Sequence, residues 1–202
     1  HWERKLGHVL SVFAMFLVYV YTSEVVSTTT LLIGMALFIP MDLLRQKKPA
    51  LNEFMVHLFR PIIRESEVNR IAGTTFLLIG VSVIVLVFSR PVVSLTLLFL
   101  AFADPAASYV GIRFGKDKIF GHKSVQGFVA AYVVCFLCSL IYWLVMGVVW
   151  DRVIFFSLLA GLVGALSELI PIGKLDDNLT LPVLSAIGLS LLIYLFRFTS
   201  PL

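Results

Sequence analysis

Three carboxylates and an asparagine lie close together near the carboxyl end of the chain, in the stretch ELIPIGKLDDN at residues 168–178. Glu168 ends an apolar run, and Asp176, Asp177 and Asn178 precede the next one. Adjacent carboxylates in a loop suit Mg²⁺, which takes one or two carboxylates together with water and phosphate oxygens. The other interpretation is a solvated loop in which Asp177 or Asn178 caps the following helix, and one segment can serve both purposes.

A second stretch, DPAASYVGIRFGK at residues 104–116, places one carboxylate ahead of two glycines and several bases. Asp104 follows a long apolar run. Gly111 and Gly115 allow a backbone to approach phosphate closely, with exposed amide groups that cradle it, and Lys116 adds a positive charge. The same spacing is also the G-x-x-x-G pattern of closely packed helices, so phosphate binding and packing are alternatives here.

A basic loop follows directly, GHKSVQG at residues 121–127. His122 and Lys123 precede Ser124, which is a suitable N-cap for the apolar helix that begins there, and Gly127 lies in the first turn of that helix. The amino end of a helix favours anions because its backbone N–H groups are unpaired. The two glycine-containing stretches together favour phosphate binding over helix packing alone.

The third group lies at the start of the chain, where WERKLGH at residues 2–8 precedes the first apolar run. Arg4 and His8 are one helical turn apart, and Lys5 lies beside Arg4. These bases can bind phosphate, or they can anchor the helix at the membrane interface together with Trp2.

The familiar motifs of several soluble enzyme classes are absent from the sequence. There is no G-x-x-x-x-G-K-S/T loop, no H-R-D or D-F-G of protein kinases, no H-E-x-x-H and no G-x-S-x-G. The residues alone therefore indicate metal-assisted chemistry on a phosphate compound at the surface of a membrane, without specifying the reaction.

These groups must be positioned by membrane helices, because the chain is 59% apolar and 14% charged over 202 residues. Soluble domains carry about 25% charged residues. Several apolar runs of about 17 to 20 residues are long enough to span hydrocarbon. We expect an all-α, polytopic membrane helical bundle that forms one domain over residues 1–202. About seven transmembrane helices are expected, at residues 6–21, 28–44, 71–88, 92–103, 125–149, 153–170 and 179–196. The fourth is short and is expected to continue through Pro105 to Ile112, packed against protein and not lipid.

One further helix is expected at the membrane interface, within the polar stretch at residues 45–70. Apolar residues recur there with helical spacing, and Pro61 interrupts the pattern near its end. The apolar members are Leu51, Phe54, Met55, Leu58, Phe59 and Ile62. With lysines and arginines on both sides of it, this amphipathic helix should lie in the head-group region. It is either a surface anchor or a lip that guides a lipid toward the site.

Seven crossings would bring all three groups to one face of the bilayer. That face receives residues 1–5, 45–70, 104–124 and 171–178. It carries thirteen of the sixteen basic residues, so the positive-inside rule makes it cytosolic. Counted with the adjoining helix ends, which carry His8, Asp42 and Glu168, the same face collects ten of the twelve acidic residues and all four histidines, which the rule does not require. Carboxylates near helix ends, such as Asp104 and Glu168, are costly in a membrane unless they are paired, hydrated or bound to a metal, so a site explains them best.

In combination, these stretches resemble the CTP-dependent lipid kinases, the family of dolichol kinase, phytol kinase and the fungal diacylglycerol kinase. The resemblance covers nearly the whole chain and follows five elements in order. These are Glu3, Arg4, Lys5 and His8; Arg70, Gly73, Thr74 and Thr75; the D-P-A-A-x-x-x-G-x-x-x-G stretch from Asp104; K-S-x-x-G from Lys123; and the stretch from Glu168 to Pro182. One departure is Gln126, where the family pattern K-S-x-E-G leads us to expect an acidic residue.

This resemblance implies CTP as the phosphate donor, together with Mg²⁺, Ca²⁺ or another divalent cation. The compact core looks most like the fungal diacylglycerol kinase. That likeness implies diacylglycerol as the lipid acceptor, phosphatidate as the product, and a cytosol-facing site in the endoplasmic reticulum or nuclear envelope. A dolichol or phytol kinase, a phosphatidate cytidylyltransferase-like enzyme and, outside enzymes, a membrane transporter are the alternatives. The net charge is +4, and the basic residues adjoin apolar spans. We therefore expect them to bind anionic lipid head groups or phosphorylated substrates, and not a nucleic-acid polymer. The oligomeric state is left open.

The resemblance also implies roles for particular residues. Asp104, Asp176 and Asp177 would hold the metal on the CTP phosphates, and Asp177 or Glu168 would accept the proton of the lipid hydroxyl. A larger set of basic, glycine and polar residues would bind the nucleotide. These are Arg4, Lys5, His8, Gly111, Gly115, Lys116, His122, Lys123, Ser124, Gly127 and Asn178.

Overall fold

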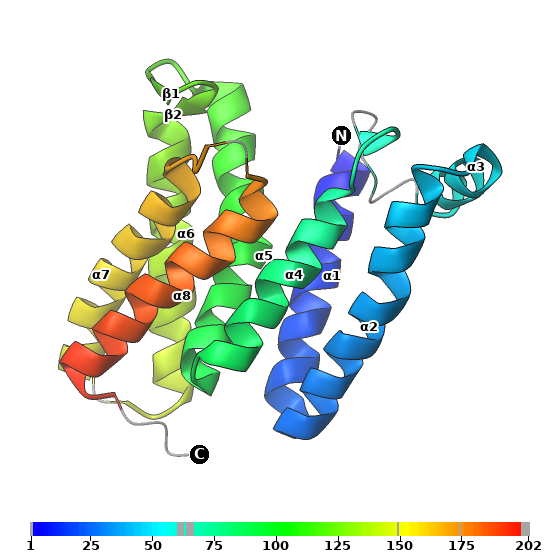
Figure 1. The fold of residues 1–202 in the computed structure, drawn as a ribbon. Coiled ribbons are helices and arrows are strands. Elements are labelled where there is room, and N and C mark those ends of the chain that lie inside the picture. The colour runs from blue at the N-terminus through cyan, green and yellow to red at the C-terminus, as the bar shows by residue number, and fades with distance from the viewer. Residues whose placement is uncertain (1, 60–62, 64–66, 149, 174, 199–202) are drawn as a thin grey trace.

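The computed structural model folds into helices and one short hairpin (Figure 1). It describes residues 2–59, 63, 67–148, 150–173 and 175–198, and the side chains of residues 2–4, 150 and 151 are not among those described. Within these residues the helices are α1 (Trp2–Tyr21), α2 (Glu24–Arg45), α3 (Pro49–Leu58), α4 (Gly73–Val87), α5 (Arg90–Phe114), α6 (Val125–Val145), α7 (Trp150–Leu169) and α8 (Asp177–Phe196). The hairpin pairs β1 (Lys118–Phe120) antiparallel with β2 (Lys123–Ser124).

The all-α class predicted from the sequence is confirmed, whereas the number of spanning helices is not. Within the described residues, five helices are long and apolar enough to cross a membrane, namely α2, α5, α6, α7 over residues 152–169, and α8. The apolar helices at Lys5–Tyr21 and Gly73–Val87 are shorter. At 1.5 Å per residue they reach about 25 Å and about 22 Å, against about 30 Å for the hydrocarbon core.

The long helices run in alternating directions, so the segments that carry the polar motifs gather at one end of the bundle (Figure 1). This end, hereafter the site end, holds the starts of α1, α4, α6 and α8, the ends of α2, α5 and α7, and α3 with the hairpin. The ends of α1, α4, α6 and α8 lie at the opposite end. The three groups identified in the sequence therefore share one side of the molecule.

The central helix is α5, which α1, α6 and α8 surround and whose residues from Val92 to Ala101 are all buried. The predicted continuation is confirmed, because the helix runs unbroken to Phe114. Pro105 lacks an N–H, so the Ala101 carbonyl loses its usual helical donor, which neighbouring helices make tolerable. The placement of Asp104 at the end of a span is wrong, because this residue lies in the middle of a 25-residue helix.

Glycines let α5, the hairpin and α6 meet closely. A Cβ atom on Gly115 would lie 2.6 Å from Ser124 Oγ, and one on Gly127 would lie 2.8 Å from the Ala107 carbonyl oxygen. Side chains do not fit at such distances, so close packing accounts for both glycines. The predicted N-cap is confirmed, since the Ser124 hydroxyl accepts a hydrogen bond from the Gly127 N–H at 3.2 Å.

The helix α3 takes the place of the predicted amphipathic helix, although it ends before the apolar pattern does. Met55 is buried against the bundle, whereas Phe54 and Leu58 are exposed. Phe59, just beyond the helix, packs edge-on against Phe38 of α2 with the ring centroids 5.8 Å apart. Other predicted members of this region, Arg60, Pro61, Ile62 and Arg64, lie outside the described residues.

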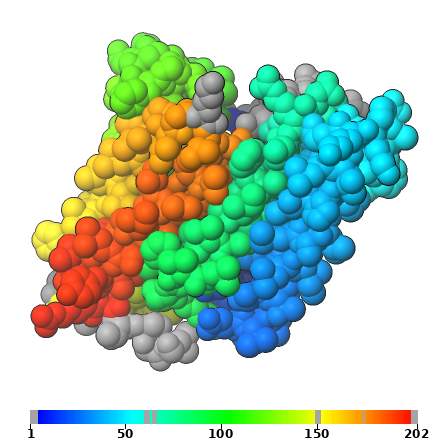
Figure 2. Space-filling model, in the orientation of Figure 1, coloured from blue at the N-terminus to red at the C-terminus, as the bar shows by residue number. Residues whose placement is uncertain are grey.

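The helices on the two sides of α5 are held by different contacts, namely helix packing on one side and hydrogen bonds from Arg90 on the other. On one side α4 packs between α8 and α2, and the three lie side by side across one face of the molecule (Figure 2). On the other side Arg90, at the start of α5, holds the end of α1. Its Nη2 atom donates to the Tyr19 and Thr22 carbonyls at 2.6 Å each, using oxygens that a helix end leaves unpaired. The end of α1 farthest from the site is thereby tied to α5.

Candidate active site

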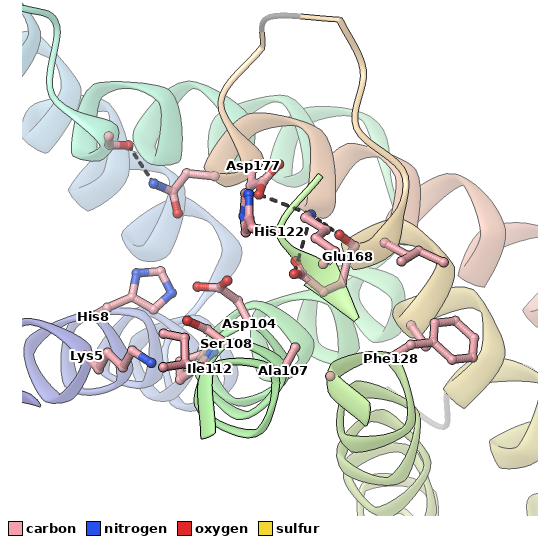
Figure 3. A pocket seen from close by; sticks show the side chains of 18 of the residues that line it. Lys5, His8, Asp104, Ala107, Ser108, Ile112, His122, Phe128, Glu168 and Asp177 are labelled. Atoms are coloured by element: carbon pink, nitrogen blue, oxygen red, sulfur yellow. Dashed lines mark hydrogen bonds and ion pairs between the residues drawn. The ribbon is translucent and has the colours of Figure 1, made fainter. Parts of the chain in front are cut away.

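A cavity of about 440 Å³ lies at the site end, where α1, α4, α5, α6, α7, α8 and the hairpin meet. Figure 3 shows side chains reaching it from opposite walls. Eleven of the residues selected from the sequence line it, namely Lys5, His8, Asp104, Gly111, His122, Lys123, Ser124, Gly127, Glu168, Asp177 and Asn178. The three groups of motif residues thus meet in one place.

Lys123 is the positive charge in one wall of this cavity. Its Nζ atom lies 3.4 Å from Glu168 Oε1 and 3.2 Å from Asp177 Oδ2, and it also donates to the main-chain carbonyl of Glu168 (Figure 3). The ammonium is mostly buried, so water and salt screen these interactions little. One side chain therefore joins the hairpin to the end of α7 and the start of α8.

Glu168 carries the least solvated carboxylate in this wall. The residue is 7% exposed, and its Oε2 atom has no hydrogen-bond partner among the described residues. Asp104 and Asp177 are near enough to repel a negative charge on it, while Lys123 attracts one. Three carboxylates beside one paired ammonium leave a local excess of negative charge, which favours a bound cation or a retained proton.

The predicted metal site is not assembled in the expected form. Within the described part of the chain, no three His, Cys, Asp or Glu side chains are arranged to hold one metal ion. Asp176 does not line the cavity, because its Oδ1 atom accepts from the Asn178 N–H at 3.0 Å and caps α8. The expected helix cap is therefore present, but Asp176 provides it in place of Asp177 or Asn178, since α8 begins at Asp177.

Three further predicted residues do not contribute to the described lining. Gly115 is used in packing against Ser124. Lys116 is exposed outside the cavity, and its N–H donates to Gln126 Oε1 at 3.1 Å. The side chain of Arg4 lies outside the described residues. Phosphate binding by Gly115, Lys116 and Arg4 stays a prediction from the sequence.

The opposite wall belongs to α1, whose Lys5 and His8 lie near Asp104 and across the cavity from Glu168 and Asp177 (Figure 3). His8 Nε2 lies 3.1 Å from the Leu100 carbonyl oxygen, and since a carbonyl only accepts, Nε2 carries a proton. Nδ1 is then left to accept a hydrogen bond, or to donate one when the ring is protonated. The imidazole is thus oriented by α5 and is suited to a hydroxyl or a phosphate oxygen.

A buried ion pair at the end of α2 was not predicted from the sequence. Arg45 Nε donates to Asp42 Oδ1 at 2.6 Å, and both side chains are 0% exposed. The second Asp42 oxygen accepts from the Ala72 N–H at 2.9 Å and from Thr75 Oγ1 at 2.6 Å. The available signal was an acid and a base three residues apart at the end of an apolar run, where charges must be paired.

The guanidinium of Arg45 also holds the backbone that leads into α4. It donates to Asn52 of α3 and to the carbonyls of residues 67, 68 and 70, at distances between 2.7 and 3.0 Å. Beyond this segment Gly73 lines the cavity, and its carbonyl accepts from Asn178 Nδ2 at 3.3 Å. The Asp42–Arg45 pair therefore positions one wall of the cavity without lying in it.

Comparison with curated proteins identifies relatives along most of the chain. CTP-dependent diacylglycerol kinase 1 of Schizosaccharomyces pombe is 34% identical over 155 residues, which cover 72% of this chain and 71% of that protein. The chain belongs to the CTP-dependent diacylglycerol kinase family. Proteins of the same name from Eremothecium gossypii and Saccharomyces cerevisiae are 31% and 27% identical over 78% of this chain, which spans 56% and 61% of their lengths. No protein-family model matches the chain, and no solved structure matches it at a significant level.

As a member of the CTP-dependent diacylglycerol kinase family, the chain departs from the expected motif at Gln126. The Gln126 side chain accepts from the Lys116 N–H through Oε1 and donates to Asp117 Oδ2 at 3.0 Å through Nε2. A neutral amide makes both bonds, whereas a carboxylate could only accept. Gln126 therefore connects α6 to the start of the hairpin.

We expect Arg45→Ala to destabilise the protein far more than the loss of an exposed charge. The change leaves Asp42 buried without its cation and removes the donors to residues 67–70, and breaking a buried pair costs about 3–5 kcal/mol. The measurement is the free energy of unfolding in detergent. Glu53→Gln, at an exposed position of α3, is the control and should stay within about 0.5 kcal/mol of the parent chain. Equal stability of the two variants would contradict the positioning role.

Proposed function

We propose that the chain is a CTP-dependent diacylglycerol kinase that transfers the γ-phosphate of CTP to the hydroxyl of diacylglycerol and so forms phosphatidate. The observation that carries this proposal is that Asp104, Glu168 and Asp177 line one cavity at the site end of a membrane bundle. A lipid hydroxyl at head-group depth can reach such a cavity from the side, while a nucleotide enters from water. The names of the relatives support CTP and diacylglycerol as the two substrates.

The reaction needs aligned substrates and neutralised phosphate charge. The lipid hydroxyl oxygen forms a bond to the γ-phosphorus, the bond from that phosphorus to the oxygen bridging the β- and γ-phosphates breaks, and CDP leaves. The hydroxyl proton passes to a carboxylate. We assign this role to Glu168, because its buried Oε2 atom has no hydrogen-bond partner among the described residues. Asp177, the other base inferred from the sequence, is much more exposed.

A divalent cation such as Mg²⁺ fits this site. A cation that arrives on nucleotide phosphates needs one or two protein carboxylates, and the cavity offers oxygen ligands with a local excess of negative charge. Asp104 and Asp177 are the cavity carboxylates that would hold it, and it would neutralise charge on the phosphate oxygens. Asp176 is assigned to the cap of α8.

The nucleotide would enter on the side of the hairpin. Lys118 and His122 line the cavity there, and the Lys118 ammonium donates to the His122 carbonyl at 3.2 Å. Ser124 and Gly127 mark the amino end of α6, which favours anionic groups. Lys5 faces the same space from α1 and adds a second positive charge near the phosphates.

We further propose that all seven long helices cross the membrane, with the site end in the cytosol. The support is the alternating direction of the helices and the thirteen of sixteen basic residues expected on this side. The shorter α1 and α4 would cross where the bilayer thins locally, at a modest cost in free energy. The endoplasmic reticulum and nuclear envelope are the membranes that the family resemblance implies.

The reaction class is tested with CTP labelled at either the γ- or the α-phosphate. Diacylglycerol, dolichol, phytol and phosphatidate are offered separately to the purified protein. We expect label from the γ-phosphate on diacylglycerol and none from the α-phosphate. Label from the α-phosphate on phosphatidate would instead show a cytidylyltransferase, and transfer to dolichol or phytol alone would overturn the choice of acceptor.

Asp104→Asn tests the carboxylate at the centre of the site. The amide keeps the size of the side chain but loses its charge, and removal of a metal ligand lowers activity by about 100-fold or more. The measurement is kcat for CTP-dependent phosphorylation, together with the thermal midpoint in detergent. Asp117→Asn is the matched control, because Asp117 is exposed on the hairpin and outside the cavity lining. Near-parental turnover of a folded Asp104→Asn protein would remove Asp104 from the site.

Cysteine labelling tests the topology in a chain whose Cys135 and Cys138 are replaced by alanine. We expect Lys48→Cys and Phe120→Cys to react with a membrane-impermeant maleimide from the cytosolic side, and Tyr21→Cys to react from the other side. All three positions are exposed, and α2 alone separates Tyr21 from Lys48. Reaction of both from the same side of sealed vesicles would exclude a crossing by α2 and with it the seven-span arrangement.

A further inference from the structure

The cavity continues beyond the charged groups along α1. Lys5, His8, Ser11 and Met15 all line it, and they recur at the spacing of one helical face. Ten residues of helix rise about 15 Å, so this face leads from the site end well into the spanning part of α1. Along it the side chains change from an ammonium and an imidazole to a hydroxyl and then a thioether. The inner end of the cavity is thus apolar.

The helix α4 mirrors this change on the facing wall. Gly73 and Thr74 line the cavity at the start of α4, and Leu77 lines it one turn further in. Met15 and Leu77 therefore line the same cavity from two different helices. Contact with the Met15 thioether and the Leu77 isobutyl group does not stabilise a charged nucleotide. It does stabilise a hydrocarbon chain, which is removed from water there.

The seam between α1 and α4 is loosely packed within the described residues. α1 packs on α5, and α4 packs on α8 and α2, but α1 and α4 make no extensive contact with one another. Figure 1 shows α1 and α2 close together at the end far from the site and diverging toward the site end. Arg90 at the far end and the His8–Leu100 hydrogen bond at the site end both hold α1 on α5, and neither joins α1 to α4. Helix packing therefore closes the side of the cavity between α1 and α4 less than it closes the side between α6 and α7.

The other apolar wall of the cavity is closed. Phe128 and Leu169 line it on α6 and α7, two helices that pack closely along their length. A Cβ atom on Gly161 would lie 3.1 Å from Phe136 Cβ, and one on Gly164 would lie 2.9 Å from Cys135 Cβ, both on α6. A lipid chain cannot pass between helices in such contact.

The geometry points to the seam between Met15 of α1 and Leu77 of α4 as the place where the acyl chains of the diacylglycerol leave the cavity for the bilayer. This inference rests on the proposed function, since it concerns the acceptor of that reaction. The hydroxyl would lie at Asp104 and Glu168, the glycerol backbone would pass Ser11, and the chains would contact Met15 and Leu77. The nucleotide and the lipid then occupy opposite ends of one cavity.

The test uses Met15→Trp and Leu77→Trp, which fill the seam, in the full chain in detergent micelles. Leu10→Trp and Leu86→Trp are the matched controls, because Leu10 on α1 and Leu86 on α4 are 58% and 65% exposed and outside the cavity lining. We expect kcat/KM for dioleoylglycerol to fall about tenfold or more in the seam variants, while the KM for CTP stays within about twofold of the parent value. The short-chain dioctanoylglycerol should lose less, since it reaches the site through water.

Two results would overturn the inference while leaving the proposed function intact. One is dioleoylglycerol kinetics in both seam variants equal to those of the controls, and the other is an equal loss for CTP and lipid in variants that remain folded. A parent chain with no diacylglycerol kinase activity would instead reject the proposed function. If the seam variants do not fold, a diacylglycerol with a diazirine close to its ester carbonyl is photo-crosslinked to the parent chain. Adducts in α1 and α4 support the seam, and adducts confined to α6 and α7 reject it.

Discussion

The pairing of Lys123 with Glu168 and Asp177 is the interaction on which the site depends. The ammonium comes from the hairpin between α5 and α6, while the carboxylates come from the last turn of α7 and the first turn of α8. One mostly buried charge therefore joins three elements: the hairpin, α7 and α8. Its removal would leave the buried Glu168 carboxylate without its cation, which is far more costly than the loss of an exposed pair. The wall that holds the proposed base is thus kept in place by the same charge that makes a buried carboxylate tolerable there.

The buried Asp42–Arg45 ion pair positions the other side of the cavity through hydrogen bonds to the backbone. Asp42 and Arg45 lie outside the lining, but their hydrogen bonds hold the backbone of residues 67–72, and Asn178 of α8 then bonds to Gly73. Two groups of hydrogen-bonded residues therefore border the cavity. One is centred on Lys123 and the other on the Asp42–Arg45 pair. Between them α1 depends mainly on α5, through His8 at one end and Arg90 at the other. A helix held at two points along one neighbour is suited to border a passage for a flexible lipid.

The two proposed substrates differ in where they come from, and the cavity reflects that difference. Its charged and glycine-rich end lies at the hairpin, where the close contact of Gly115 with Ser124 sets β2 on the end of α5. Its apolar end lies deeper, at Met15, ten residues along α1 from Lys5, and at Leu77, one turn along α4 from Gly73. Asp104 lines the cavity from within α5, which continues past Pro105, and in the proposed reaction its carboxylate would lie where the lipid hydroxyl meets the phosphate. Asp104 lines the cavity from a helix, and not from a loop at its edge, because α5 continues unbroken past this residue.

The helical membrane class, the gathering of the polar motifs at one end, eleven residues of the cavity lining and the family could all be predicted from the sequence. These features could be predicted from the lengths of the apolar runs and the alternating direction of the crossings, because both are properties of short stretches of the chain. Only the tertiary structure decided the rest. Asp176 proved to be a cap, because α8 begins at Asp177, two residues earlier than the apolar pattern at residues 179–196 suggests. The continuation of the helix past Pro105 was expected, but the structure shows that it runs to Phe114 and that Asp104 lies near its middle and in the cavity lining. The Asp42–Arg45 centre went unseen because its partners lie up to 33 residues away, and local spacing does not show which distant backbone groups a buried charge will meet.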